Sequence, residues 1–170
     1  MRQVTKDEVL ALLTDVVSER GASYRYRRPD HMRDEWEGEV CLYWHTDQSG
    51  ESDGAPGCIA GQAFHRLGIS GDRLKGYETR SANYVCENNP SLQFHPEASW
   101  VLRRAQAIQD AGLPWGVALA HCDHVGTVPP EEFVLTDDEA RMSWDGLRVT
   151  LEGIDYQLDR ALNPTWPVAG

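Results

Sequence analysis

The sequence lacks the features of a membrane, secreted or nucleic-acid-binding protein. No apolar run approaches the length that crosses a bilayer, and segment 1–6 contains no apolar signal-peptide region. The formal net charge of −11 gives little long-range attraction for phosphate groups or anionic lipid. We therefore expect a cytoplasmic protein that binds neither membranes nor nucleic acid directly.

Cysteine is scarce, and the common metal and cofactor motifs are missing. Cys41, Cys58, Cys86 and Cys122 include no C-x-x-C pair, and we expect them to stay reduced in the cytoplasm. The chain also has no H-E-x-x-H motif and no phosphate-binding Gly-Lys-Ser/Thr motif. No complete set of nucleophile, base and orienting group stands out. We therefore expect no cofactor, and the sequence favours a non-enzymatic protein.

The chain does contain enough apolar residues for one folded domain. Its 170 residues are 41% hydrophobic and include six tryptophans, a composition typical of a globular protein. Apolar spacing predicts a compact cluster of about four helices, near 6–20, 57–67, 96–111 and 114–121. With the strands described below, this pattern predicts an α+β fold whose main domain spans 1–126.

Two segments rich in aromatic residues predict a β-hairpin. Tyr24 and Tyr26 alternate with arginines, and segment 39–45 is apolar on both faces of an expected strand. We expect these two strands to pair. Further along, Ser70 is placed to cap one short helical turn, and segment 81–87 has a pattern that suits either a helix or a loop.

Residues 127–170 predict a linker, a small antiparallel β meander and a tail, packed on the main domain. Asp145-Gly146 is a hairpin signal, and apolar residues alternate on both sides of it. One long helix capped at Thr136 with Glu139 is the alternative, but two interior glycines and the alternation weigh against it. The alternating residues are Met142 and Trp144 before this turn, and Leu147, Val149, Leu151, Ile154, Tyr156 and Leu158 after it.

The stretch 56–69 predicts the central helix of the molecule and contains the main candidate nucleophile. Cys58 follows a Gly-rich turn at the expected helix N-terminus, where the helix dipole favours a thiolate. A hydrolase or transferase using Cys58 would also need a histidine base, and the expected late strands contain none. A small buried cysteine is the simpler interpretation.

A second group of residues could hold zinc. His121 and His124 would share a helical face, with Cys122 and Asp123 beside them. The spacing matches no established zinc signature, and histidines near a helix C-terminus also suit the helix dipole. A zinc site therefore stays an alternative to a polar helix end.

Several segments together resemble small uncharacterised proteins of actinobacteria and their phages. The resemblance rests on a Pro-Gly-Cys-Ile-x-Gly-x-x-x-His-Arg-Leu-Gly helix and a Gln-Asp-x-Gly-x-x-Trp-Gly segment, at 56–68 and within 106–116. Residues 19–22, Cys41 and Tyr43 also match, and the resemblance covers roughly 5–122. It implies a helical, intracellular protein, with a phage-encoded protein as one candidate, and it assigns no catalytic residues.

We expect a binding or regulatory protein, such as a phage accessory factor that acts on a host protein or a small signalling molecule. The partner is then a protein or a small molecule, and the oligomeric state is open. The last 41 residues carry nine acidic and three basic side chains, so we place the candidate interaction surface there. Its candidate residues are Trp144, Asp145, Asp155 and Tyr156.

Overall fold

The computed structural model describes residues 1–32, 42–49, 53–133 and 143–164. This part of the chain contains seven α-helices and four short strands, so the expected α+β class is confirmed with more helices than predicted. The strands form two separate pairs, one parallel and one antiparallel. The parallel pair joins β1 (Arg2–Val4) to β4 (Leu92–Phe94), and the antiparallel pair joins β2 (Trp44–His45) to β3 (Ala55–Pro56).

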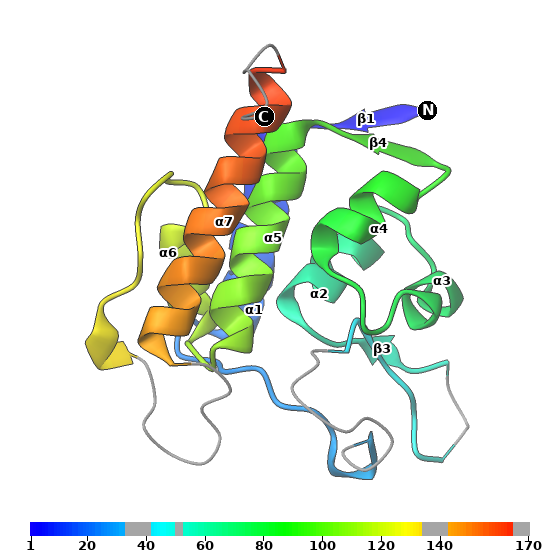
Figure 1. Ribbon diagram of the computed structural model, residues 1–170. Coiled ribbons are helices and arrows are strands. Elements are labelled where there is room, and N and C mark those ends of the chain that lie inside the picture. The colour runs from blue at the N-terminus through cyan, green and yellow to red at the C-terminus, as the bar shows by residue number, and fades with distance from the viewer. Residues whose placement is uncertain (33–41, 50–52, 134–142, 165–170) are drawn as a thin grey trace.

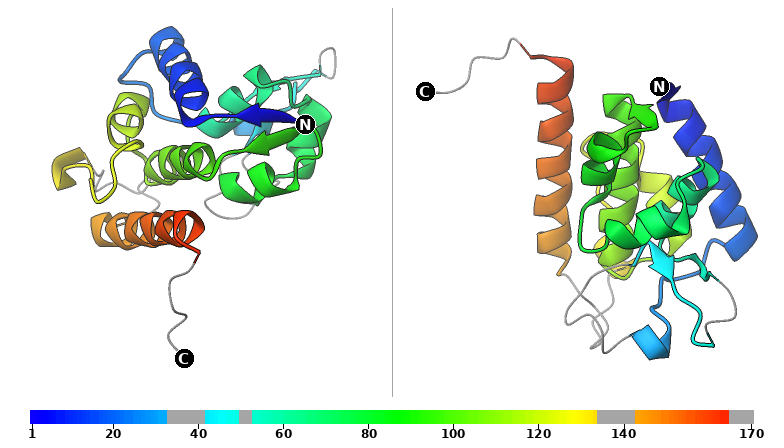
Figure 2. Two further views of the ribbon diagram at one scale, coloured as in Figure 1. Left: turned by 90° about the horizontal axis from the view of Figure 1, so that it is seen from above. Right: turned by 90° about the vertical axis from the view of Figure 1, so that its right-hand side faces the viewer.

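Helix α5 (Pro96–Asp110) is the element around which the other helices pack. Seen from above, it lies between α7 on one side and α1 and α6 on the other (Figure 2). Most of its residues are buried, including Ala98, Leu102 and Ile108. Its helical neighbours are α1 (Lys6–Arg20), α2 (Ile59–Arg66), α4 (Ala82–Asn88), α6 (Trp115–His121) and α7 (Trp144–Leu162) (Figure 1).

The long helices begin and end where local sequence rules place them. The Thr5 hydroxyl accepts a hydrogen bond from the Glu8 amide at the start of α1, and Gly21, with φ of 96°, follows its last residue. Pro96 occupies the first turn of α5. The helices expected at 6–20, 57–67, 96–111 and 114–121 are therefore present, each within two residues of its expected bounds.

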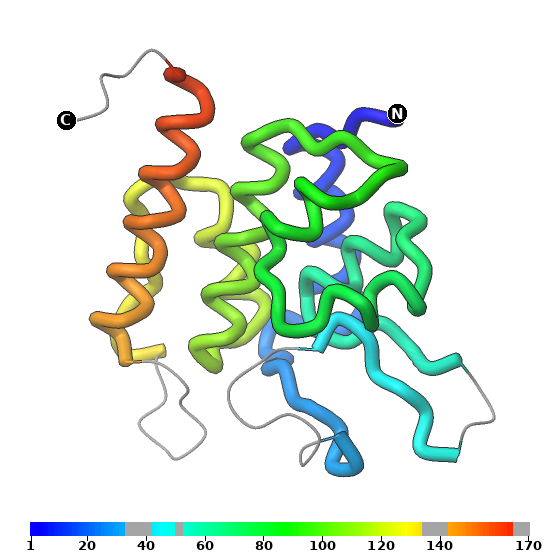
Figure 3. Tube along the Cα trace, turned by 45° about the vertical axis from the view of Figure 1, so that its right-hand side comes forward, coloured from blue at the N-terminus to red at the C-terminus, as the bar shows by residue number. Residues whose placement is uncertain are grey.

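The short segments after α2 are also helical. The Ser70 hydroxyl accepts from the Arg73 amide and begins α3 (Gly71–Gly76), the turn expected there. Segment 81–87, whose sequence suited either a helix or a loop, forms the helix α4 (Ala82–Asn88). Helix α3 packs against α2, whereas α4 packs against α5 (Figure 3).

Glycines let the segment before β2 lie directly on the N-terminus of α2. The Gly57 amide donates to the Tyr43 carbonyl at 2.9 Å, and the Cys58 amide donates to the Leu42 carbonyl at 2.9 Å. A Cβ atom at Gly61 would stand 2.3 Å from the Tyr43 carbonyl oxygen, so no larger residue fits. The stretch 56–69 thus owes much of its pattern to close backbone packing.

The expected pairing of the two aromatic segments is wrong. Residues 24–26 are not a strand; the Tyr24 carbonyl accepts instead from the Trp115 amide at the start of α6, at 2.8 Å. Trp44 and His45 pair with Pro56 and Ala55. The aromatic segments meet through a side chain, because the Leu42 amide donates to the Tyr26 hydroxyl. Residues 39–41, including Cys41, lie outside the described residues.

The predicted C-terminal β meander is also wrong, because the segment forms α7. The Ser143 hydroxyl accepts from the Gly146 amide at 3.1 Å and begins the helix, so Asp145-Gly146 lies in its first turn. The alternating residues Val149 and Tyr156 are exposed. Thr136, Glu139 and Met142 lie outside the described residues. The buried face has helical spacing and consists of Leu147, Leu151, Ile154 and Leu158.

Candidate functional site

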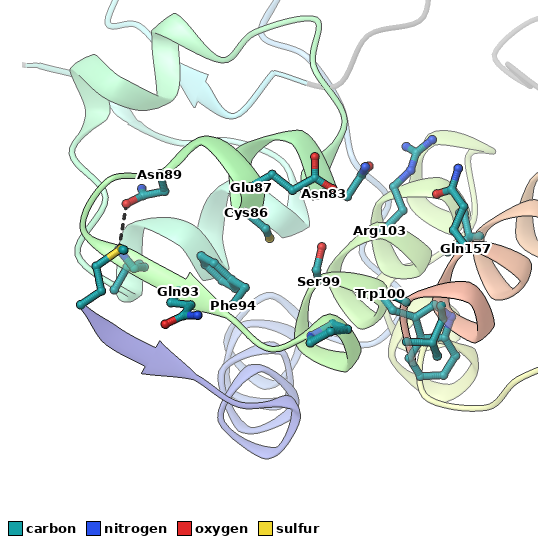
Figure 4. A pocket seen from close by; sticks show the side chains of 16 residues that line it. Asn83, Cys86, Glu87, Asn89, Gln93, Phe94, Ser99, Trp100, Arg103 and Gln157 are labelled. Atoms are coloured by element: carbon teal, nitrogen blue, oxygen red, sulfur yellow. Dashed lines mark hydrogen bonds between the residues drawn. The ribbon is translucent and has the colours of Figure 1, made fainter. Parts of the chain in front are cut away.

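A pocket of about 400 Å³ opens between α4, β4, α5 and α7. Its volume falls within the range of roughly 300–1,000 Å³ that is usual for small-molecule sites. Figure 4 shows side chains from all four elements converging on it. Because β4 enters α5 directly through His95, the strand and the first two turns of α5 form one continuous wall.

The inner wall of the pocket is apolar and held in place by packing. Leu92 comes from β4, Trp100 from α5, and Ile154 and Leu158 from α7. Each of these side chains is at least nine-tenths buried in the molecule. A wall of this kind favours a ligand with an apolar body, because binding removes apolar surface of both ligand and wall from water.

The outer part of the pocket carries polar side chains. Arg103 is half-buried on α5, Gln157 is exposed on α7, and Glu87 and Asn83 face them from α4 (Figure 4). The Asn83 side-chain oxygen accepts from the Ser81 hydroxyl at 2.6 Å, which leaves its amide nitrogen as a donor. The pocket is therefore apolar inside and polar at its mouth.

Cys86 lines the pocket but is a poor nucleophile. Burial raises the pKa of its thiol to about 12, although a hydrogen bond from the Ser99 side chain acts in the opposite direction. Since the thiolate is the reactive form, the side chain is neutral near pH 7. Cys86 contributes a weakly polar surface to the pocket wall.

A buried ion pair fixes the position of α7 beside the pocket. Arg104 has no exposed side-chain surface and donates to Asp155 at 2.8 Å. The other Asp155 oxygen accepts from the Gly126 amide at 2.8 Å, and the Trp100 indole donates to Asp155 at 2.9 Å. Arg104 also donates to the His121 and Thr127 carbonyls. Together these bonds tie α5, α7 and the segment after α6 to one another.

Two buried glutamines of α5 have a structural role that the sequence pattern did not reveal. Gln109 accepts from the Ile59 amide at 2.7 Å, and Gln106 accepts from the Ala82 amide at 2.8 Å. Each therefore satisfies an unpaired amide in the first turn of another helix, α2 or α4. The only sign of this role in the sequence is that two glutamines stand among the apolar residues of α5, and a solvent-facing side of the helix would give the same pattern.

Cys58 occupies the N-terminal cap of α2, as expected, and is fully buried. Its sulfur accepts from the Gly61 amide at 3.4 Å. A nucleophile must meet its substrate, and this sulfur has no exposed surface through which to do so. This position is that of a buried helix cap, which is consistent with a structural cysteine.

The candidate zinc residues are not arranged around a common point. The buried Cys122 thiol donates to the Leu119 carbonyl at 3.3 Å, and burial raises its pKa to about 12. Asp123 pairs with Lys6 at 3.4 Å, and His124 is exposed. Burial and the nearby Arg104 charge lower the pKa of His121. Within the described ranges, no three histidine, cysteine or acidic side chains are grouped to hold a metal.

The candidate interaction residues at the C-terminal end do not share one surface role. The Asp155 carboxylate is used inside the fold, as described above. The Trp144 indole is half-buried and donates to the Pro129 carbonyl at 2.8 Å. Asp145 and Tyr156 are exposed on α7, and Asp145 lies 3.7 Å from Arg148. The four residues therefore divide between packing and solvent.

Two titratable groups, Glu78 and His45, lie at β2. Glu78 accepts from the Tyr43 and Trp44 amides, both at 3.0 Å, and burial raises its pKa to about 7 despite these bonds. Burial lowers the pKa of His45 to about 4. The Tyr26 hydroxyl, which accepts from the Leu42 amide, also forms a hydrogen bond with the His45 ring at 2.9 Å. Neither group lines the pocket.

Comparisons with known proteins add no family to this picture. No protein-family model, curated protein or solved structure matches the chain. In the described part of the chain, no helix combines the length and apolar character needed to cross a membrane.

Proposed function

We propose that this chain is a non-enzymatic binding protein that takes a small amphiphilic molecule into the pocket between α4, β4, α5 and α7. The observation that carries the proposal is the pocket itself, apolar inside and polar at its mouth. A regulatory role follows naturally, because a ligand would contact both α4 and α7 and could change how these two helices pack. Of the two kinds of partner expected from the sequence, a protein and a small molecule, the proposal takes the small molecule.

A small molecule suits the molecule better than a large protein partner. The large exposed apolar side chains of the described residues come from separate segments: Met1 at the N-terminus, Val125 after α6, Phe133 further along the chain, and Val149, Tyr156 and Leu162 on α7. Single exposed apolar residues are normal on a folded surface and do not mark an interface. The proposal also includes a cytoplasmic location, which the free buried thiols of Cys58, Cys86 and Cys122 support.

Fluorescence titration with N-phenyl-1-naphthylamine, a neutral apolar probe, tests the proposal. We expect saturable binding of one probe per chain. Ala161→Trp would place a large ring at an exposed position that lines the pocket, and should weaken binding at least about tenfold. Ala11→Trp changes another exposed alanine, on α1 and outside the pocket, and serves as the matched control. Absence of saturable binding, or equal binding by both variants, would refute the proposal.

A further inference from the structure

Building on the proposed function, we infer that the pocket selects a small organic anion, whose charged group is bound by Arg103 while its apolar body lies against Trp100 and the α7 side chains. The pocket alone defines only an amphiphilic ligand. The state of the charged groups around its mouth defines the sign of the ligand's charge.

Arg103 differs from the arginines that the fold uses. Arg66 pairs with Glu19, Arg104 with Asp155, and Arg148 with Glu152. For Arg103, no acidic side chain among the described residues lies within salt-bridge distance. It is half-buried rather than fully solvated, so its charge is only partly compensated by water. A half-buried guanidinium without a partner at a pocket mouth attracts an anion.

Two uncharged hydrogen-bond donors, the side-chain amides of Asn83 and Gln157, line the pocket together with Arg103. Figure 4 labels Arg103 on α5, Gln157 on α7 and Asn83 on α4 at the same end of the pocket. The Asn83 side-chain oxygen accepts from the Ser81 hydroxyl, and the donor that this side chain can offer a ligand is its amide nitrogen. An anionic group at this place would meet a guanidinium and amide donors from three helices. Hydrogen bonds to an ionised acceptor are roughly twice as strong as those between neutral groups.

Glu87 lines the same pocket and opposes an anion, so its effect must be separated from that of Arg103. It is exposed on α4, where water screens its charge, whereas Arg103 is half-buried. The arginine should therefore dominate. The two residues should then affect an anionic ligand in opposite directions, an effect that a purely apolar pocket would not produce.

The test compares two probes that share one apolar body. 8-Anilinonaphthalene-1-sulfonate carries an anionic group, and N-phenyl-1-naphthylamine is its neutral counterpart. We expect the wild-type protein to bind the sulfonate more tightly. Arg103→Gln should weaken sulfonate binding by roughly three- to tenfold and leave the neutral probe unchanged. Glu87→Gln should tighten sulfonate binding, and Arg103→Lys should restore most of the affinity that glutamine loses.

Arg27→Gln is the control for net charge, because Arg27 is exposed and lies outside the pocket. It should leave both probes unchanged. Equal loss of both probes in Arg103→Gln would show that the side chain acts by packing, and would overturn the inference. Neutral binding that Ala161→Trp abolishes, with no preference for the sulfonate, would also overturn it while leaving the proposed function intact. Failure of both probes to bind would instead remove the proposed function.

Discussion

Replacing Asp155 with alanine should destabilise this protein more than its position on an outer helix would suggest. Asp155 receives hydrogen bonds from Arg104, the Trp100 indole and the Gly126 amide. All three donors lose their acceptor in the variant. Arg104, whose side chain has no exposed surface, then keeps only neutral acceptors for its charge, the His121 and Thr127 carbonyls and the Thr127 hydroxyl.

The size of this effect follows from the burial of the pair. Removing one member of a buried ion pair typically costs about 3–5 kcal/mol, because the remaining charge is left uncompensated. Arg104 still donates hydrogen bonds to the His121 and Thr127 carbonyls, so we expect the loss of unfolding free energy to lie near the lower limit, ~3 kcal/mol. For a chain of this size, that change lowers the melting temperature by roughly 6–12 °C.

Urea denaturation followed by circular dichroism measures the loss directly. Glu152→Ala on the same helix is the matched control, since Glu152 forms only an exposed pair with Arg148 and should cost less than about 0.5 kcal/mol. A loss below about 1 kcal/mol for Asp155→Ala would show that the ion pair does not hold α7 in place, and would refute this reasoning.

Three further predictions concern residues that do not line the pocket. Glu78 has a pKa of about 7 in the folded protein against its usual 4.5. Its contribution to stability is therefore complete below about pH 4.5 and is lost as the pH rises through 7. Glu78→Gln should remove this loss in urea titrations between pH 5 and 8, and an unchanged pH dependence of the unfolding free energy would contradict the assignment. Gln109→Ala strands the buried Ile59 amide and should cost about 2 kcal/mol by denaturation, whereas a neutral effect would mean that the amide finds another acceptor. Thr79→Gly should raise stability by about 1 kcal/mol in thermal melts, because Thr79 is exposed with φ of 71°, and destabilisation would show that its side chain is needed.

Local signals in the sequence were sufficient to predict the position of the helices that have clear capping residues and wide apolar faces. The Thr5 cap and the Gly21 terminus define α1, and Pro96 defines the start of α5. These signals act within one or two turns of the chain, so no knowledge of the tertiary structure is needed to read them. The same is true of the short helix that Ser70 begins.

The C-terminal error has a specific cause: its apolar residues fit two periods at once. Leu147 and Leu151 lie two residues from Val149 and also four residues from each other, so both a strand and a helix can place them on one face. The exposed Val149 and Tyr156 produced the alternation without being part of the core. Gly146 lies in the first turn with its amide bonded to Ser143, where a glycine costs a helix little.

The pocket could not be predicted because its wall comes from segments that are distant in sequence. Asn83, Leu92, Arg103 and Leu158 belong to four different elements, and no short motif contains them. The Gly-rich stretch around Cys58 has a structural role instead. Cys58 caps α2, and the neighbouring glycines allow the backbone of segment 42–45 to approach closely. Residue type alone does not separate a cap or a close approach from a site.

Methyl NMR of the full chain, titrated with N-phenyl-1-naphthylamine, tests the central claim most directly. If the pocket between α4, β4, α5 and α7 binds the probe, the methyl signals of Leu92, Ile154 and Leu158 should shift progressively to saturation. Those of Val149 and Leu162, which are exposed on α7 outside the pocket, should stay in place. Shifts centred on Val149 and Leu162, with the pocket methyls unmoved, would contradict the account.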